Sequence, residues 1–360
     1  MRARDASGLR AIILLASATA IVVTFTYPCW VQDLALAQYG EMINSIPGAA
    51  LRGAKRDRDA LASQLAGRTL THRFGIFALF QRDTIRRSTT SDFNGFDSKT
   101  PGFLVGLDYR LLPSLAAGVL VGSKFTDLDF DKGTALSGRK HPLQSGQQMT
   151  RTFNFGVSGS YAPQSPWYGA GSLLVGLLDV HTKRRVPAGG TPIRGSTEGY
   201  MLSFLGTGGY RFFWNRIQTG PVVTCGYDYL RIGGYRETGD KQETKDLLTV
   251  NQTPYGQLML KLGGQTTYSL PVPWGVVSPR LRLGFVYRDT FGTLTFMHIV
   301  PPKKTQMHPN TLPGNTSMEL GGGATMLLPY DWQVWVDYNS YLFETATQRG
   351  ILTVGIRKDF

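Results

Sequence analysis

The sequence predicts an all-β protein: a 12-stranded antiparallel transmembrane β-barrel, with a preceding α-helix expected in the lumen. Three observations predict this fold class. An export signal opens the chain, apolar and polar residues alternate in repeated segments of strand length, and the connections between these segments are alternately long and short. In a transmembrane barrel, alternation directs apolar side chains to lipid and polar ones to the interior, and the turns are short at one end only.

Residues 1–37 are predicted to form a cleaved signal peptide. A basic stretch is followed by apolar "AIILLASATAIVVTF", and "ALA" at 35–37 is a small-x-small cleavage site. Cleavage after Ala18 or Ala20 and retention as a signal anchor are the alternatives. The rest of the chain is then divided into a linker with a lumen helix, residues 38–72, and the barrel, residues 73–360.

The composition limits how such a chain can cross a membrane. The formal net charge is +13, Gly occurs 43 times, and 16 Tyr, 19 Phe and 6 Trp supply many aromatic side chains. Beyond the signal, no stretch provides the roughly 20 apolar residues that a spanning helix needs. Signal cleavage removes Cys29 and leaves Cys225 without a partner, so we expect no intramolecular disulfide.

Alternation is clearest in "GFLVGLDYRLL" (102–112), "VSPRLRLGFVYR" (277–288) and "DWQVWVDYNSY" (331–341). Because successive side chains of a strand point to opposite faces, each segment has one apolar face and one face that is small, polar or charged. The length of each segment is close to that of a tilted membrane-spanning strand, which is about 9–11 residues. The same pattern predicts twelve strands, at residues 74–82, 102–112, 115–125, 151–161, 167–182, 197–213, 216–230, 252–267, 274–288, 315–328, 331–343 and 348–360.

The connections separate this barrel from other β architectures. Long polar loops are expected at 83–101, 126–150, 183–196, 231–251 and 289–314, and short turns fall between them. Outer-membrane barrels have this asymmetry. A soluble β-sandwich or propeller is the competing architecture, but the export signal, the aromatic residues near strand ends and the loop asymmetry favour the barrel. A closed sheet also leaves no strand edge unpaired in lipid.

The last residues, "TVGIRKDF", resemble the C-terminal signal that the bacterial outer-membrane insertion machinery reads, carried here by Thr353, Gly355, Ile356 and Phe360. Further stretches, "GFLVGLDYRLLPSLAAGVLVG", "GPVVTCGYDYLRIGGYRETG" and "VSPRLRLGFVYRD", extend the likeness. The last 290 or so residues resemble the translocator domain of autotransporters, the barrel of type V secretion. The sequence departs from the family at Lys358, where an aromatic residue is common. By its alternation alone, the C-terminus equally fits a final edge strand on an ordinary core.

The resemblance implies location in the outer membrane of a Gram-negative bacterium, with membrane insertion and protein translocation or pore formation as the function. It implies outer-membrane lipid and lipopolysaccharide, the barrel-assembly machinery and periplasmic chaperones as partners. No cofactor and no nucleic acid is expected, since no basic helix or recognised nucleic-acid motif accompanies the positive charge. A porin-like or adhesive surface barrel is the alternative function.

In this family a helix before the first strand runs through the lumen, and "AALRGAKRDRDALASQLAGR" (49–68) matches it in place and composition. Its charged residues suit a wet lumen and not lipid; the basic ones are Arg52, Lys55, Arg56 and Arg58. A helix outside the pore is the alternative. The eleven residues 38–48 are too few for a secreted passenger domain. We therefore expect a passenger-less relative, a partner of a separate chain, or a sequence that lacks its upstream part.

If the charged faces of the strands point inward, twelve charged residues line the wall, eight basic and four acidic: Asp108, Arg110, Lys124, Arg211, Asp228, Lys261, Arg280, Arg282, Arg288, Glu319, Asp337 and Arg357. This predicts a water-containing lumen that is biased toward anions. The alternative is that these charges pair with one another and with the helix.

The sequence does not predict an enzyme. The five His residues have no metal-ligand spacing such as H-E-x-x-H, and no metal site is expected. A barrel protease or lipase remains the alternative, because Asp127, Asp129, Asp131 and His141 share one expected loop. The basic loop "KRRVPAGGTPIR" (183–194) either contacts lipopolysaccharide phosphates or is simply solvated.

Overall fold

The computed structural model describes residues 73–88, 95–130, 146–162, 166–184, 192–239, 247–298, 305–309, 315–343 and 347–360. All of them belong to the second of two compact units, Gly40–Phe360. The predicted signal peptide and the predicted lumen helix lie outside the described residues. No helix within the described ranges is long and apolar enough to cross a membrane.

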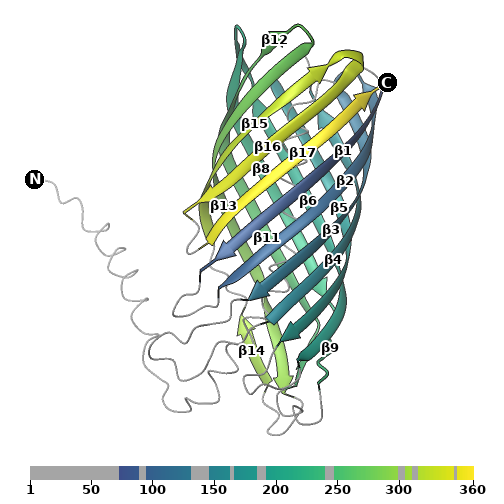
Figure 1. Cartoon of the computed structure of the whole chain (residues 1–360), viewed down its shortest axis with the longest axis vertical. Coiled ribbons are helices and arrows are strands. Elements are labelled where there is room, and N and C mark those ends of the chain that lie inside the picture. Colours follow the sequence, from purple (N-terminus) through teal and green to yellow (C-terminus); the bar gives the residue numbers. More distant parts are fainter. Residues whose placement is uncertain are drawn as a thin grey trace, which may run out of the picture. The chain divides into compact units, whose positions relative to one another are not determined.

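Twelve long strands of the described chain form a closed antiparallel barrel, and the predicted fold class is confirmed (Figure 1). Each strand pairs with the next along the chain, and the last pairs with the first. The strands are β1 (Phe74–Arg87), β2 (Phe96–Leu112), β3 (Leu115–Phe130), β4 (Gly146–Tyr161), β5 (Trp167–Arg184), β6 (Ile193–Tyr210), β8 (Ile217–Ile232), β11 (Thr253–Tyr268), β13 (Gly275–His298), β15 (Asn315–Leu328), β16 (Trp332–Leu342) and β17 (Thr347–Asp359).

The C-terminal strand closes the barrel. β17 pairs with β1 from Gly75, opposite Asp359, to Arg87, opposite Thr347. Beyond the last pair, the Phe360 amide donates to the Phe74 carbonyl at 2.9 Å and the Phe74 amide donates to the Phe360 carbonyl at 3.3 Å. Closure satisfies backbone groups that would be costly to leave unpaired in lipid. The interpretation of the C-terminus as an edge strand is therefore wrong.

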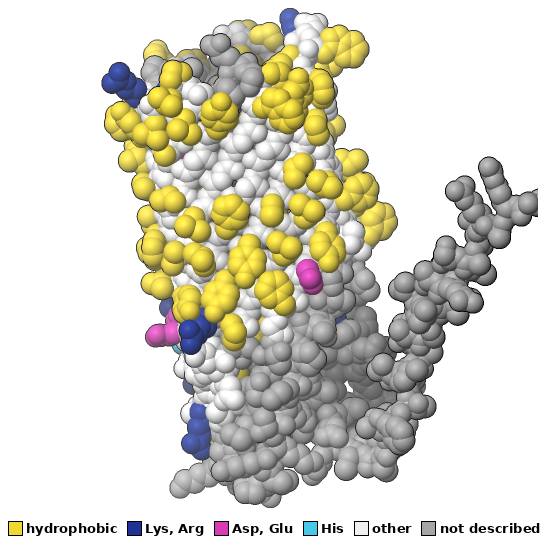
Figure 2. Space-filling model, turned by 180° about the vertical axis from the view of Figure 1, so that it is seen from behind, with side chains coloured by type: hydrophobic (Ala, Val, Ile, Leu, Met, Phe, Trp, Pro, Cys, Tyr) yellow, Lys and Arg dark blue, Asp and Glu magenta, His cyan; other side chains and the backbone are white. Residues whose placement is uncertain are grey.

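The apolar faces of the strands point outward. On β2, Phe103, Val105 and Leu107 are exposed, whereas Leu104 and Asp108 are buried, and the other strands alternate in the same way. Apolar side chains cover the outer wall as a result (Figure 2). A soluble sandwich or propeller would bury these side chains in a dry core and expose the charges. The inverted arrangement is that of a barrel surrounded by lipid.

Several strands extend further than predicted at the end that carries the long loops. β2 begins at Phe96 and β13 continues to His298, inside regions that were expected to be loops. The outward apolar side chains form a belt around the barrel. Backbone hydrogen bonding between antiparallel neighbours does not depend on lipid, so the strands continue to pair beyond this apolar belt, where their side chains are polar. The short strands β9 (Tyr235–Arg236), β10 (Leu248–Val250) and β14 (Thr305–Pro309) add to the sheet at this end. At the opposite end, β7 (Phe212–Trp214) and β12 (Leu270–Val272) pair with β8 and β13.

Candidate functional site in the barrel lumen

The structure places the predicted lumen charges on the inward side of the wall. Those with buried side chains are Asp108, Lys124, Asp228, Arg280, Arg288, Glu319, Asp337 and Arg357. Those with half-buried side chains are Arg110, Arg211, Lys261 and Arg282. Their inward direction follows from strand alternation, because each of these residues lies next to outward-facing apolar neighbours.

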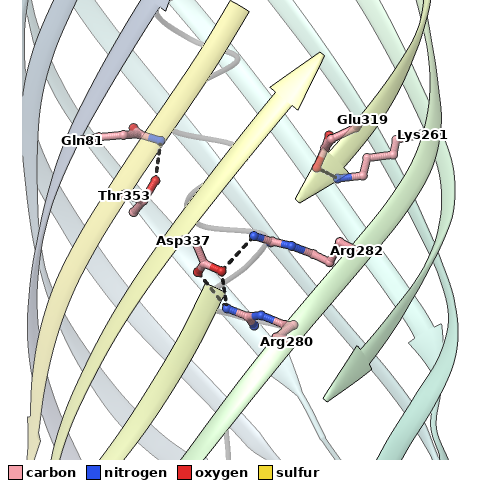
Figure 3. Close-up of polar contacts among 7 residues, drawn as sticks. All are labelled: Gln81, Lys261, Arg280, Arg282, Glu319, Asp337 and Thr353. Carbon is pink, nitrogen blue, oxygen red and sulfur yellow. Dashed lines mark hydrogen bonds and ion pairs between the residues drawn. The ribbon is translucent and has the colours of Figure 1, made fainter. Parts of the chain in front are cut away.

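A cluster of three charges lies on the wall formed by β13, β15 and β16. Arg280 donates to both carboxylate oxygens of Asp337, Nη2 to Oδ2 at 2.7 Å and Nη2 to Oδ1 at 2.9 Å. Arg282 Nη2 donates to Oδ1 of the same carboxylate at 2.9 Å (Figure 3). Two guanidinium groups thus share one carboxylate through charge-assisted hydrogen bonds.

These bonds cross an intervening strand. Arg280 on β13 and Asp337 on β16 both have Gly323 of β15 as their register partner. A Cβ atom at Gly323 would lie 2.1 Å from Asp337 Oδ1, so only a glycine leaves room for the crossing. An ion pair between second-neighbour strands draws them together on the concave side, and thereby stabilises the curvature of the closed wall.

The same relationship recurs between β11 and β15. Lys261 Nζ donates to Glu319 Oε1 at 2.6 Å (Figure 3). β13 lies between them, and its residue opposite Glu319 is Gly284. The lysine side chain runs over this glycine, where an added Cβ would lie 3.4 Å from Lys261 Cε.

A third crossing spans the seam of the barrel. Arg357 on β17 donates from Nη1 to Asp108 Oδ2 on β2 at 2.7 Å and from Nε to Asp359 Oδ1 at 2.6 Å. Between them, β1 contributes Gly75, which is the register partner of both Asp108 and Asp359. The two strands that meet at the seam are therefore also tied to β2.

Further polar contacts hold the seam and the opposite wall. Gln81 of β1 donates to Thr353 Oγ1 of β17 at 3.3 Å (Figure 3). On the opposite wall, Ser203 Oγ donates to Asp228 Oδ1 at 2.6 Å. Near the short-turn end, the Arg211 guanidinium lies 4.3 Å from the centre of the Tyr168 ring, a cation–π contact.

Comparison with known proteins decides the family. The family model described as the autotransporter beta-domain matches residues 76–339, which is most of the chain. The chain belongs to the autotransporter β-domain family. No curated protein matches the sequence. The β-barrel domains of this family are outer-membrane proteins of Gram-negative bacteria, and they are generally non-enzymatic.

Solved autotransporter structures share the fold. The translocator domain of NalP from Neisseria meningitidis is 13% identical with a TM-score of 0.66, covering 88% of this chain and 98% of that one. The β-domain of the Bordetella autotransporter BrkA is 16% identical with a TM-score of 0.58, covering 80% of this chain and 100% of that one. The transport unit of AIDA-I from Escherichia coli is 9% identical with a TM-score of 0.56, covering 85% of this chain and 99% of that one.

The lumen of this autotransporter barrel also holds apolar side chains that sequence reasoning did not single out. A buried apolar cluster gathers inward-facing residues from most of the strands: Phe77, Leu79, Leu104, Leu120, Leu174, Leu205, Met259, Val286, Trp335, Tyr341 and Ile351. Trp335 covers Gly355, where an added Cβ would lie 2.0 Å from the indole ring. The alternation did contain this signal, since Leu104 shares the inward face with Asp108.

Sequence reasoning also missed inward charges near the strand ends. Arg349 of β17 donates to Asp83 of β1, Nη2 to Oδ2 at 2.7 Å. Arg184 donates to Glu237 through two buried bonds of 2.9 and 2.5 Å. Asp83 and Glu237 fall in segments that the sequence predicts to be loops, 83–101 and 231–251. The signal that could have identified them is in the sequence: polar residues continue to alternate with others beyond the apolar belt. With these pairs included, much of the inward charge is neutralised within the wall.

The four residues of the predicted insertion signal lie on both faces of β17. Thr353 and Gly355 point inward, whereas Ile356 and Phe360 point outward. Lys358, where this sequence departs from the family, also lies on the outward face. Its Nζ donates to the Tyr330 carbonyl in the turn before β16, and it lies 5.7 Å from the Trp332 ring and 5.5 Å from the Phe360 ring. The lysine therefore binds the rim of the barrel instead of standing in lipid.

The residues of the alternative enzyme hypothesis are not gathered in one described loop. Asp127 and Asp129 lie on the outward face of β3, while Asp131 and His141 lie outside the described residues. The described ranges hold no group of three His, Cys, Asp or Glu residues that could bind a metal ion. Cys225 is a free, exposed thiol. The basic residues of the predicted lumen helix, Arg52, Lys55, Arg56 and Arg58, also fall outside the described residues.

Proposed function

We propose that this chain spans the outer membrane of a Gram-negative bacterium and acts there as a translocator barrel without catalytic activity. The observation that carries the proposal is the inverted wall: an apolar belt outside, and inside a set of buried charges tied to one another across strands. Such a wall tolerates a polar polypeptide or water in the lumen while it stays closed toward lipid. The family match supports the same function.

We further propose that the residues at the C-terminus, with Phe360 at the end of the seam, are read by the barrel-assembly machinery after delivery by periplasmic chaperones. The supporting observation is that the final residue is part of the seam itself, through its two backbone hydrogen bonds to Phe74. A machinery that binds the last strand would thus hold the strand whose pairing completes the barrel.

The translocation test uses the full chain in a Gram-negative host, with an epitope inserted within residues 38–48. Antibody labelling of intact cells is expected to detect the epitope at the surface, and heat-modifiable migration of the outer-membrane fraction reports that the barrel is folded. A folded barrel in the outer membrane whose epitope is labelled only after cell lysis would contradict translocation.

Orientation is tested separately by protease treatment of intact cells. Sites engineered into the long connections at 131–145 and 240–246 are expected to be cut, whereas a site in the short turn at 163–165 is expected to be protected until lysis. Cleavage in the short turns of intact cells would reverse the proposed orientation.

A further inference from the structure

A basic pocket lies on the outer face of the barrel, at the end that carries the long connections. It has a volume of about 500 Å³, and its lining includes Lys183 of β5, Arg194 of β6 and Arg236 of β9. Thr238 and Ser196 add hydroxyl groups, and Asp127 contributes a carboxylate. Residues of two consecutive strands and of the more remote β9 thus form one cationic pocket.

Three cations and one carboxylate line this pocket, so its lining has a net positive charge. Lys183 and Arg194 are register partners on neighbouring strands, and both point outward. Like charges directly opposite each other on one face of a sheet are unfavourable. None of Lys183, Arg194 and Arg236 forms an ion pair with a residue that the structure describes. Their repulsion would be relieved by an anion bound between them.

The inner face behind the pocket shows the opposite arrangement. Arg184, the residue after Lys183, forms a buried ion pair with Glu237, the residue after Arg236, at 2.5 Å. Charge is therefore matched on the inner face, where Arg184 reaches Glu237 across β6, and left positive on the outer face. Backbone hydrogen bonds between Arg194 and Thr238, of 2.9 and 2.8 Å, fix the segment of β9 against β6. The pocket is consequently held in place from both sides.

The height of the pocket above the apolar belt indicates which membrane component supplies the anion. On β5 and β6, the strands that carry Lys183 and Arg194, the belt ends at the paired residues Leu177 and Tyr200. Lys183 lies six residues beyond Leu177 on the same strand, which corresponds to roughly 15 Å above it for a tilted strand. The headgroup layer of a phospholipid bilayer adds only about 5–8 Å beyond the hydrocarbon. Phosphates at the height of the pocket belong to a glycolipid with a phosphorylated oligosaccharide core.

We infer that Lys183, Arg194 and Arg236 form a binding site for the phosphate groups of lipopolysaccharide in the outer leaflet. Guanidinium and ammonium groups bind phosphate through charge-assisted hydrogen bonds, and Arg does so with two parallel donors. The inference rests on the proposed outer-membrane orientation. It assigns the contact to three strands and not to a single basic loop.

The test measures binding of lipopolysaccharide to the purified full-length chain in non-ionic detergent. We compare the parent with the triple variant Lys183→Gln, Arg194→Gln, Arg236→Gln. The matched control is Arg73→Gln, Arg82→Gln, Arg216→Gln, which removes the same charge from exposed positions outside the pocket. The pocket variant is expected to bind at least about tenfold more weakly, since several charge-assisted bonds are lost. The control is expected to stay within about twofold of the parent. Heat-modifiable migration confirms folding of each variant.

Three further arms distinguish the sources of phosphate and the alternatives. Dephosphorylated lipopolysaccharide is expected to bind the parent as weakly as the pocket variant binds the intact glycolipid. If the parent binds inorganic phosphate as tightly as lipopolysaccharide, the assignment to a glycolipid is overturned. If the pocket variant binds lipopolysaccharide like the parent, or the control variant loses as much affinity as the pocket variant, the assignment of the site is overturned. If the triple variant does not fold, each single variant is expected to weaken binding, and three single variants with parental affinity would contradict the inference. These arms use folded protein in detergent, so their failure leaves the translocation experiment untouched.

Discussion

Arg280 binds Asp337 across β15, and the only side-chain position between them is occupied by Gly323. The pair therefore links β13 with β16, which are second neighbours in the wall. Lys261 with Glu319, and Arg357 with Asp108, form equivalent links over Gly284 and Gly75. All three links lie on the inner side, where shortening the distance between alternate strands favours curvature. A structural role in keeping the wall closed follows from this geometry.

The first prediction concerns the glycine under the crossing. Gly323→Ala places a Cβ 2.1 Å from the present position of Asp337 Oδ1, which forces the carboxylate away from Arg280. We expect destabilisation of about 1–3 kcal/mol, as for overpacking at other close-packed sites. The urea concentration at the midpoint of unfolding in detergent measures it.

The matched control is the preceding residue. Gly322 lies on the outward face of the same strand, and an added Cβ would meet only Leu281 Cδ2, at 3.8 Å. Gly322→Ala is expected to change the midpoint little. Equal loss in both variants would show that β15 requires glycine for its backbone and not for the crossing.

The second prediction concerns the link at the seam. Asp108→Asn leaves Arg357 with Asp359 as its acidic neighbour, so we expect a loss of stability below the roughly 3–5 kcal/mol of a fully orphaned buried charge. A double-mutant cycle with Arg357→Gln is expected to give a coupling energy of at least about 0.5 kcal/mol. Additive effects would mean that the crossing does not contribute to stability. Asp228→Asn, on the opposite wall, is the comparison variant.

Much of the fold could be predicted from the sequence, because strand alternation is visible in most of the spanning segments; 167–182, which is apolar on both faces, is the exception. The short turns were placed well, since the apolar segments end abruptly there, as between Leu112 and Leu115. At the end that carries the long connections, several strands are longer than the sequence predicts. A length of about 9–11 residues describes the part within lipid, whereas β13 continues to His298 on polar residues.

The candidate site could be predicted only as a face and not as a set of contacts. Alternation indicates that Asp337 and Arg280 share the inward side, but 57 positions separate them in sequence. Their pairing depends on the registers of β13 with β15 and of β15 with β16, which no local pattern specifies. The basic pocket was missed in part for the same reason, because Arg236 reaches Arg194 only through the pairing of a segment that was expected to be loop.

The third prediction separates assembly from stability at the C-terminus. Phe360→Ala keeps the two backbone hydrogen bonds with Phe74 and removes an outward side chain that is 60% exposed. We expect the stability of the folded barrel to fall by about 1.5 kcal/mol or less, while the amount of barrel inserted in cells falls strongly. Heat-modifiable migration of the outer-membrane fraction measures the second effect. Leu352→Ala, an outward apolar residue of the same strand outside the signal, is expected to insert normally. Parallel behaviour of the two variants would argue against recognition of Phe360.

The fourth prediction concerns Asp127, which lies beyond the apolar belt beside the basic pocket. Partial burial, and secondarily the charge of Asp129, raise the pKa of the Asp127 carboxyl above its usual value of 3.8. The stability that this shift contributes is fully present below pH 3.8 and is lost as the pH rises through the folded-state pKa, because the ionised form is disfavoured in the folded protein. Asp127→Asn is therefore expected to be slightly more stable than the parent at pH 7, and to lose this advantage on acidification below pH 3.8. Urea unfolding at both pH values measures the difference. An Asn variant that is less stable than the parent at pH 7 would contradict this, and would show that the ionised carboxylate has a favourable partner. Asp127→Asn is also expected to bind lipopolysaccharide more tightly at neutral pH, because it removes a negative charge from the lining of the pocket.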